Sequence, residues 1–361
     1  MSAAALGVIR PGLHTTVQDL GRIGAQNQGI PVSGALDPIA LRAANVVVGN
    51  AQDAAGLEIA VMGPVLEVEA ESVRVAVAGL GSRLVVEAAD GTTRDVPPLQ
   101  SVRLSRGDRV RVTAASGSSV AYLAIEGGLA LPPFMGSLAT YVRGSFGGYD
   151  GRALAAGDRL PLVADAVEVR AEMRLTDFDL SPAPEARVIL GPQDDYFTPE
   201  AIEKLVAGPY TVSREADRMG IRLEGAPLEH SKGYNIVSDG IAPGSIQVPG
   251  SRLPIILLAD RQTAGGYPKI ATIISADLAA VGRLLPGMAL RFKIVTIAGA
   301  QAARRQLEER MSDLTSRLVT VRPDGPDLDR LYDSNLVSGV VDAEKPRVSA
   351  LSSEEDDALH T

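Results

Sequence analysis

The sequence predicts a mainly β protein with few helices, built as two consecutive halves. Residues 73–77 and 110–112 place valine at every second position, which is typical of half-buried antiparallel strands. The 37 glycines and 23 prolines are spread along the chain as turn signals, which favours many short strands. A length of 361 residues is enough for two domains that each bury a core.

A weak internal repeat supports the division into halves. Residues 63–67 (GPVLE) resemble residues 225–229 (GAPLE), and residues 104–110 (LSRGDRV) resemble residues 284–290 (LLPGMAL). The segment 176–187, which holds two prolines and several acids, is typical of a linker. We therefore expect a first half at 1–175, a second half at 188–298, and a third segment at 299–361.

Helix ends are visible at three places. Asp37 and Pro38 are suited to the start of a helix that Gly49 ends, and Thr198 with Pro199 predicts the start of a second helix. After residue 298, charges at a spacing of four residues predict a solvated helix. The acidic, hydroxyl-rich end of the chain is expected to be mobile.

Composition excludes several classes of function. A net charge of −9 disfavours a nucleic-acid partner, and the absence of cysteine excludes disulfides and thiolate chemistry. No apolar run approaches 18 residues and no signal sequence is visible, so we expect a cytoplasmic protein without a membrane anchor. The three histidines are far apart in sequence, and neither GxxxxGK[ST] nor GxGxxG occurs, so neither a metal site nor a common nucleotide loop is predicted.

The stretch 247–278 is the chemically richest part of the chain. Apolar runs at 254–259 and 270–275 flank ten mostly polar residues, DRQTAGGYPK at 260–269, a pattern that predicts a buried hairpin with a functional loop. Asp260 is a candidate base, and Arg261 and Lys269 are cations suited to an anionic substrate or a developing oxyanion. The alternative is a structural turn closed by an Asp–Arg or Asp–Lys pair.

The same stretch supplies the predicted substrate-binding groups. Gly265 and Gly266 allow backbone conformations with positive φ, in which successive N–H groups can turn toward a carboxylate or phosphate. The neutral groups that would orient an amide are Gln247, Gln262, Thr263 and Tyr267.

Two other segments carry candidate residues. The glycine-bounded loop at 14–28 is either a solvated connection or a binding loop, with Gln18 as a substrate ligand and Asp19 as a second candidate base. Arg218 is either a surface partner of Asp217 or an anion clamp that faces the hairpin.

Several phrases, in order, resemble one family. They are GLHTTVQDLGRIGAQNQGIPVSGALDPIALRAANVVVGN, GPQDDYF, DRMGIRLEG, GSIQVPG and LLADRQTAGGYPKIATIISADL, and they span roughly residues 6–298. They resemble the KipA-type family, known as the C subunit of 5-oxoprolinase, as allophanate hydrolase subunit 2 and as the biotin-dependent carboxyltransferase domain of urea carboxylase.

The resemblance implies two cyclophilin-like β-barrel halves and a hetero-oligomer. The implied partners are a KipI-type chain, which is the B subunit of 5-oxoprolinase, and an A-type subunit. The leading hypothesis is an ATP-dependent hydrolase that opens 5-oxo-L-proline to L-glutamate, favoured because no biotin carboxylase, carrier or amidase segment is attached. No covalent cofactor is expected.

Two alternatives stay open at this point. One is the carboxyltransferase subunit of a split urea-type carboxylase, with carboxybiotin supplied by a separate carrier. The other, from a non-enzyme class, is a KipA-type regulatory partner of a kinase inhibitor. Dense polar loops at 14–28 and 260–269 favour catalysis, because a partner surface would expose more aromatic side chains.

Overall fold

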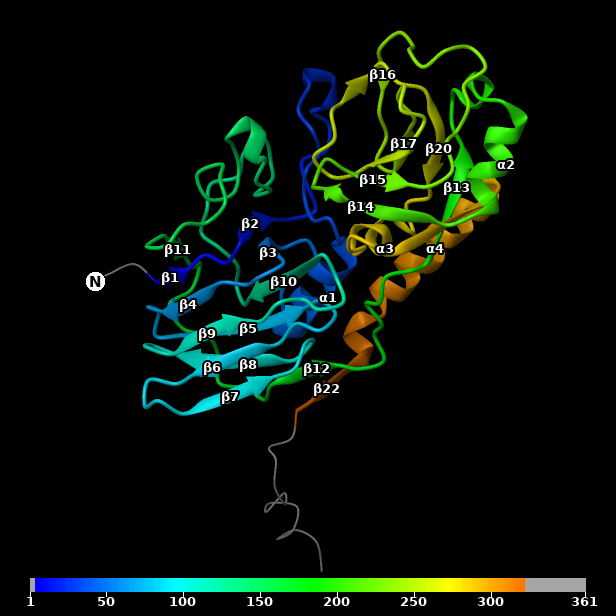
Figure 1. The fold of residues 1–361 in the computed structure, drawn as a ribbon. Helices are drawn as coiled ribbons and strands as arrows, with labels where there is room; N and C mark the ends of the chain where they lie inside the picture. Colours follow the sequence, from blue (N-terminus) through cyan, green and yellow to red (C-terminus); the bar gives the residue numbers. More distant parts are fainter. Residues whose placement is uncertain (1–3, 322–361) are drawn as a thin grey trace, which may run out of the picture. The chain divides into compact units, whose positions relative to one another are not determined.

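A computed structural model describes residues 4–321 of the chain, and the predicted acidic tail lies outside the described residues. Figure 1 shows the order of the elements along the chain. Strands far outnumber helices, so the prediction of a mainly β chain is confirmed.

The first half consists of two sheets that enclose one apolar core. One sheet has six strands, in the order β11 (Arg159–Pro161), β1 (Ala5–Arg10), β4 (Val65–Val68), β9 (Arg109–Val112), β6 (Leu84–Glu87) and β7 (Thr93–Val96). The other has five, in the order β2 (His14–Gln18), β3 (Gly56–Ala60), β10 (Val120–Ile125), β5 (Ser72–Ala78) and β8 (Ser101–Ser105). Alternate side chains from both sheets, such as Leu66 and Leu123, fill the space between them.

The second half closes into a seven-stranded barrel. Its order is β13 (Glu185–Leu190), β20 (Lys269–Ile273), β17 (Ser245–Gln247), β18 (Ile255–Leu257), β15 (Gly220–Glu224), β14 (Tyr210–Ala216) and β21 (Ala289–Ile294). Closure pairs β13 with β21 in parallel, so that each barrel strand has a neighbour on both sides. The interior is apolar, and α2 (Pro199–Ala207) packs against it through Ala201 and Leu205.

The predicted hairpin is wrong. Strands β18 and β20 match the two apolar runs, but they do not pair with each other, because β17 lies between them and pairs with both. The reason lies in the connections: residues 248–254 return the chain antiparallel from β17 to β18, and the longer segment 258–268 then carries it to β20 on the other side of β17. Within that segment β19 (Ala264–Gly265) pairs instead with β16 (Asp239–Gly240).

The predicted helix ends are confirmed for α1 (Pro38–Val48) and α2. The Asp37 side chain accepts hydrogen bonds from the N–H groups of Ile39 and Ala40, and Gly49 follows at φ 85°. Thr198 accepts a hydrogen bond from the N–H of Ala201. These caps satisfy backbone groups that the helix itself leaves unpaired, which is why local sequence was enough to place them.

A third core connects the two halves. Helix α1 packs on the outer face of β5 and β10, and its buried side chains also contact Ala279 of α3 (Leu278–Gly282), Met311 of α4 (Ile297–Ser312) and Leu314. The chain then returns to the first half, because β22 (Leu318–Thr320) pairs with β12 (Met173–Leu175). No helix among residues 4–321 is long and apolar enough to cross a membrane.

Asp37, the N-cap residue of α1, also forms a buried ion pair with Arg283. Asp37 Oδ2 accepts a hydrogen bond from Arg283 Nε at 2.5 Å, and Asp37 Oδ1 accepts one from Arg283 Nη2 at 3.1 Å. Both side chains are almost fully buried, at 2% and 5% exposed. Since α1 belongs to the first half and Arg283 follows α3 in the second, this pair ties the halves together.

We expect Asp37→Asn and Arg283→Met each to lower the free energy of unfolding by about 3–5 kcal/mol, because each leaves one buried charge without its partner. The double variant should lose clearly less than the sum of the two, because asparagine keeps the cap and no charge remains. Urea unfolding followed by far-UV circular dichroism measures all three. Additive losses would show that the pair does not couple the halves.

Candidate functional site

Residues from both halves line an open cavity of about 460 Å³. Much of its wall is apolar and includes Leu36 from the first half and Leu258 and Leu284 from the second. Its polar lining comes from His14, Glu58, Ser119, Arg143, Asp217, Arg218 and Asp260. The size and the mixture of apolar wall with a few polar groups are typical of small-molecule sites.

A buried ion cluster of Glu58, Arg218 and Asp260 lies on this cavity. Arg218 donates from Nε to Asp260 Oδ2 at 2.8 Å and from Nη2 to Asp260 Oδ1 at 3.1 Å, and its Nη1 contacts Glu58. Arg218 Nη2 also donates to the carbonyl of Gly34 at 2.7 Å. The side chains of Glu58, Arg218 and Asp260 are only 4%, 12% and 8% exposed.

The local backbone explains why these groups meet. Glu58 is in β3 of the first half, Arg218 is in the turn between β14 and β15, and Asp260 follows β18. The N–H of Asp260 donates to the carbonyl of Arg218 at 2.9 Å, which fixes the two in register. Burial alone lowers the pKa of Arg218, but Glu58 and Asp260 outweigh it and raise that pKa above its ordinary value.

Tyr122 of β10 binds the cluster through Glu58. Its hydroxyl donates to Glu58 Oε2 at 2.5 Å and accepts from the N–H of Asp37 at 2.8 Å. Burial, and then the nearby carboxylates of Glu58 and Asp37, raise the pKa of Tyr122 well above its ordinary value, so the phenol stays protonated as a donor. The N–H of Leu36 donates to the same Glu58 oxygen at 2.9 Å.

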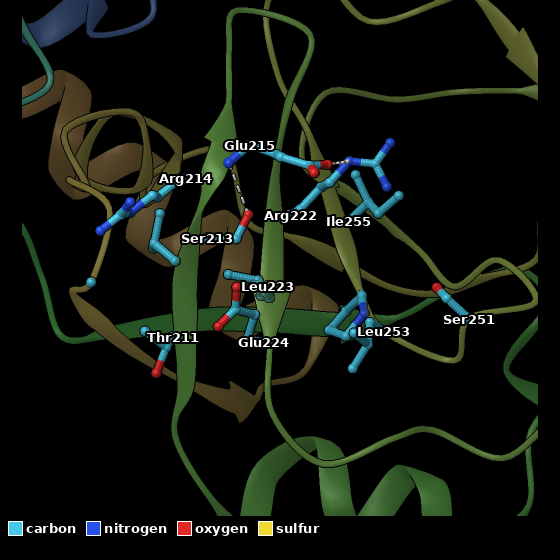
Figure 2. Close-up of a pocket in the computed structure, with 13 residues that line it drawn as sticks. Thr211, Ser213, Arg214, Glu215, Arg222, Leu223, Glu224, Ser251, Leu253 and Ile255 are labelled. Carbon is cyan, nitrogen blue, oxygen red and sulfur yellow. Dashed lines mark hydrogen bonds and ion pairs between the residues drawn. The ribbon is translucent and has the colours of Figure 1, made fainter.

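A second hollow, of about 530 Å³, adjoins the cavity and shares Arg143, Ala216, Asp217 and Met219 with it. It is lined further by Gln247, Gln262 and Tyr267, so the structure brings these three predicted ligands together. A third hollow continues over the outer face of β14 and β15. Figure 2 shows it, with Glu215 and Arg222 paired across the two strands at 3.0 Å and Arg214 pointing away from them.

The three predicted loop charges are not brought together. Asp260 lies on the cavity, where both of its oxygens are held by Arg218. Arg261 is buried behind it and donates to the carbonyls of Ile241 and Leu258, both at 3.1 Å. Burial lowers the pKa of Arg261 to about 10. Among the described residues, no ion pair or hydrogen bond joins any two of Asp260, Arg261 and Lys269.

Lys269 forms a clasp of the kind that the structural alternative predicted, though with a partner outside the loop. Its Nζ donates to Asp239 Oδ2 at 2.8 Å, and Gln193 donates to the same oxygen at 3.1 Å. The contact with Lys269, and then that with Gln193, lower the pKa of Asp239. The clasp therefore fastens β16 to the barrel.

Neither Gly265 nor Gly266 adopts the positive φ that a glycine allows. At Gly265 the requirement is close packing: a Cβ there would lie 2.8 Å from Ile241 Cδ1 and 3.0 Å from Gln247 Nε2. Thr263 and Gly266 use their carbonyls to bind the N–H groups of Ile241 and Ile236. These groups hold the loop in place.

Asp19 and Gln18 organise the arm at 131–151. Asp19 accepts hydrogen bonds from the N–H groups of Gly21 and Leu138 and from the hydroxyl of Ser137, all within 2.7 Å. Gln18 is fully buried and donates to Thr16 Oγ1 at 3.0 Å and to the carbonyl of Thr140 at 3.1 Å. Neither lines the cavity between the halves.

Arg218 is not a surface partner of Asp217, so that alternative is wrong. Asp217 lies instead 3.7 Å from Arg143 of the first half. Glu58, Tyr122 and Arg143 were not predicted from the sequence. The sequence does contain one indication of a buried polar group at Glu58, because this carboxylate lies within the apolar run LEIAV.

The arrangement can bind a small, partly apolar ring that carries an N–H group. The carboxylates of Glu58 and Asp260 can accept from an N–H, and the apolar wall can bury ring carbons. Among the described residues, no group of three or more His, Asp or Glu side chains is arranged to hold a metal ion.

Comparison with known proteins gives a consistent result. The family model for the carboxyltransferase domain, subdomain A and B, matches residues 28–294. The protein named as the C subunit of 5-oxoprolinase in Escherichia coli (strain K12) is 34% identical over 316 residues, which cover 87% of this chain and 98% of that protein. The putative urea carboxylase of Emericella nidulans is 32% identical, covering 86% of this chain but 26% of its own length.

Solved structures agree with this result. The crystal structure of TTHA0988 matches with a TM-score of 0.72 and 37% identity over 81% of this chain and 56% of that chain. That of Kluyveromyces lactis urea carboxylase matches with a TM-score of 0.78 and 28% identity over 91% of this chain and 32% of that chain. The family model spans most of the sequence, so the protein belongs to the carboxyltransferase domain A and B family, the KipA-type family that its motifs resembled.

Proposed function

We propose that the protein is the C subunit of an ATP-dependent 5-oxoprolinase, which opens 5-oxo-L-proline to L-glutamate in a complex with an A-type chain and a B-type, or KipI-type, chain. This proposal rests on the similarity to the protein named as the C subunit of 5-oxoprolinase in Escherichia coli (strain K12). The two sequences are 34% identical, and the match covers 98% of that protein. In the reaction, water adds across the lactam C–N bond. The ring nitrogen gains a proton and the carbonyl carbon becomes the second carboxylate of glutamate. The complex also hydrolyses one ATP to ADP and phosphate, which makes the ring opening favourable.

The cavity between the halves supports this substrate class. Its apolar wall suits the ring carbons of a lactam, and the carboxylates of Glu58 and Asp260 suit the ring N–H. We assign Asp260 and Arg218 to the wall that contacts substrate, and Gln247, Gln262 and Tyr267 to the adjoining hollow. Asp19, Gln18, Arg261 and Lys269 keep the surrounding loops in shape.

A second candidate function is carboxyl transfer from carboxybiotin, on a separate carrier, to a urea-type nitrogen. It is favoured by the similarity in fold to Kluyveromyces lactis urea carboxylase, at a TM-score of 0.78. Urea has N–H groups that suit the same carboxylates, but it has no ring to bury against Leu36, Leu258 and Leu284. We therefore rank the lactam-opening function first.

The first prediction is that the purified chain alone releases no glutamate from 5-oxoproline and ATP, and that adding A-type and B-type chains restores release. A mixture that lacks only this chain is the matched control and should be inactive. Glutamate is measured by amino-acid chromatography. Turnover by the chain alone would contradict the complex, and carboxylation of urea without lactam opening would favour the second candidate.

A second prediction separates a clasp from a reacting group at Lys269. Lys269→Met and Asp239→Asn both break the same ion pair, so both should lower the melting temperature by a similar few degrees and leave turnover per folded protein unchanged. Melting and glutamate release are measured on the same preparations of the complex. A variant Lys269→Met that melts normally but loses about a hundredfold in rate, beside an active Asp239→Asn, would place Lys269 at the reaction.

A further inference from the structure

The ion cluster gives the cavity a negative wall. Glu58 and Asp260 contribute two carboxylates and Arg218 contributes one guanidinium, so the cluster carries one more negative than positive charge. In a cavity with an apolar lining, such a charge attracts N–H donors and repels anions, because the surrounding medium screens it weakly. Arg218 is held on both sides and is not available to a third carboxylate.

Arg143 is the remaining arginine or lysine among the described residues that line this cavity. It is in the short 3-10 turn η2 (Val142–Gly144) of the first half, and its side chain is 61% exposed. It also lines the adjoining hollow, so its guanidinium is at the boundary between the two spaces.

The partner of Arg143 holds it loosely. Asp217 Oδ2 is 3.7 Å from Arg143 Nη2, which is too long for a strong charge-assisted hydrogen bond. The other oxygen of Asp217 accepts from the N–H groups of Met219 and Gly220 at 2.8 and 3.1 Å, so Asp217 itself is fixed by the turn between β14 and β15. The guanidinium is thus kept near the cavity with donors left for a ligand.

We propose that Arg143 determines specificity by binding the carboxylate of a small lactam acid whose ring N–H faces the negative wall. This inference rests on the proposed function and deepens it, because it selects a substrate that has an N–H and a carboxylate on adjacent ring atoms. 5-Oxoproline has this arrangement, whereas urea and the plain lactam 2-pyrrolidinone have no carboxylate. A planar guanidinium can bind such a carboxylate through two parallel hydrogen bonds.

The test uses the complex with its A-type and B-type partners. Arg143→Gln should raise the KM for 5-oxoproline about 10- to 100-fold, the value of one charged hydrogen-bonding contact, with little change in kcat. The KM of the Arg143→Lys complex should lie between those of the wild type and Arg143→Gln, because lysine keeps the charge but loses the paired donors. The control is Arg83→Gln, since Arg83 is a similarly exposed arginine, 3.3 Å from Asp95, that lines none of the three hollows.

The plain lactam gives the second readout. As a competitive inhibitor, 2-pyrrolidinone should bind the wild-type complex and the Arg143→Gln complex equally, because it has no carboxylate to lose. An unchanged KM for 5-oxoproline in Arg143→Gln, or an equal loss of 2-pyrrolidinone binding, would overturn the inference.

Failure of the proposed function is distinguishable from failure of this inference. If the wild-type complex releases no glutamate, the proposed function fails, and calorimetric binding of 5-oxoproline to the same complex then decides the role of Arg143. Binding by the wild type that Arg143→Gln weakens at least tenfold supports the inference. Equal binding by both, or none by the wild type, overturns it.

Discussion

The structure depends on one buried guanidinium that two carboxylates share. Arg218 belongs to the barrel, Asp260 follows a barrel strand, and Glu58 belongs to a sheet of the first half, so the contact fixes one half against the other. Removing any of these charges from water is costly, and only complete pairing offsets that cost. Tyr122 and the N–H of Leu36 both donate to Glu58 Oε2, which leaves few alternative arrangements of the interface.

The same contact gives the cavity its chemistry. Because the charge of Arg218 is already paired, the wall that Glu58 and Asp260 form acts as a hydrogen-bond acceptor. An acidic ligand therefore needs a cation from another part of the cavity. Arg143 is on an exposed turn and supplies that cation at the boundary with the next hollow.

Local sequence was sufficient to predict those features that depend on interactions between neighbouring residues. Asp37, Thr198 and the glycine after α1 marked helix ends, and valine at alternate positions marked strands of the first half. The sequence also showed that the loop after β18 is dense in polar groups. The residues that these polar groups bind could not be predicted. Arg218 and Glu58 are 160 residues apart, and β17 separates the two runs that looked like a hairpin, so neither fact leaves a short-range signal. At position 265 close packing selects glycine, and from the sequence alone this cannot be distinguished from a requirement for positive φ.

The most direct test of this account is the free energy of unfolding of Arg218→Met as a function of pH. We expect a loss of about 3–5 kcal/mol at pH 8, because Glu58 and Asp260 then face each other without a counter-charge. That repulsion raises the pKa of at least one carboxyl in the folded variant above its unfolded value, so stability is regained as the pH falls and the carboxyl binds a proton. The loss should therefore be clearly smaller at pH 5. A variant as stable as the wild type at pH 8, or one whose loss does not depend on pH, would contradict the claim that this cluster holds the halves together.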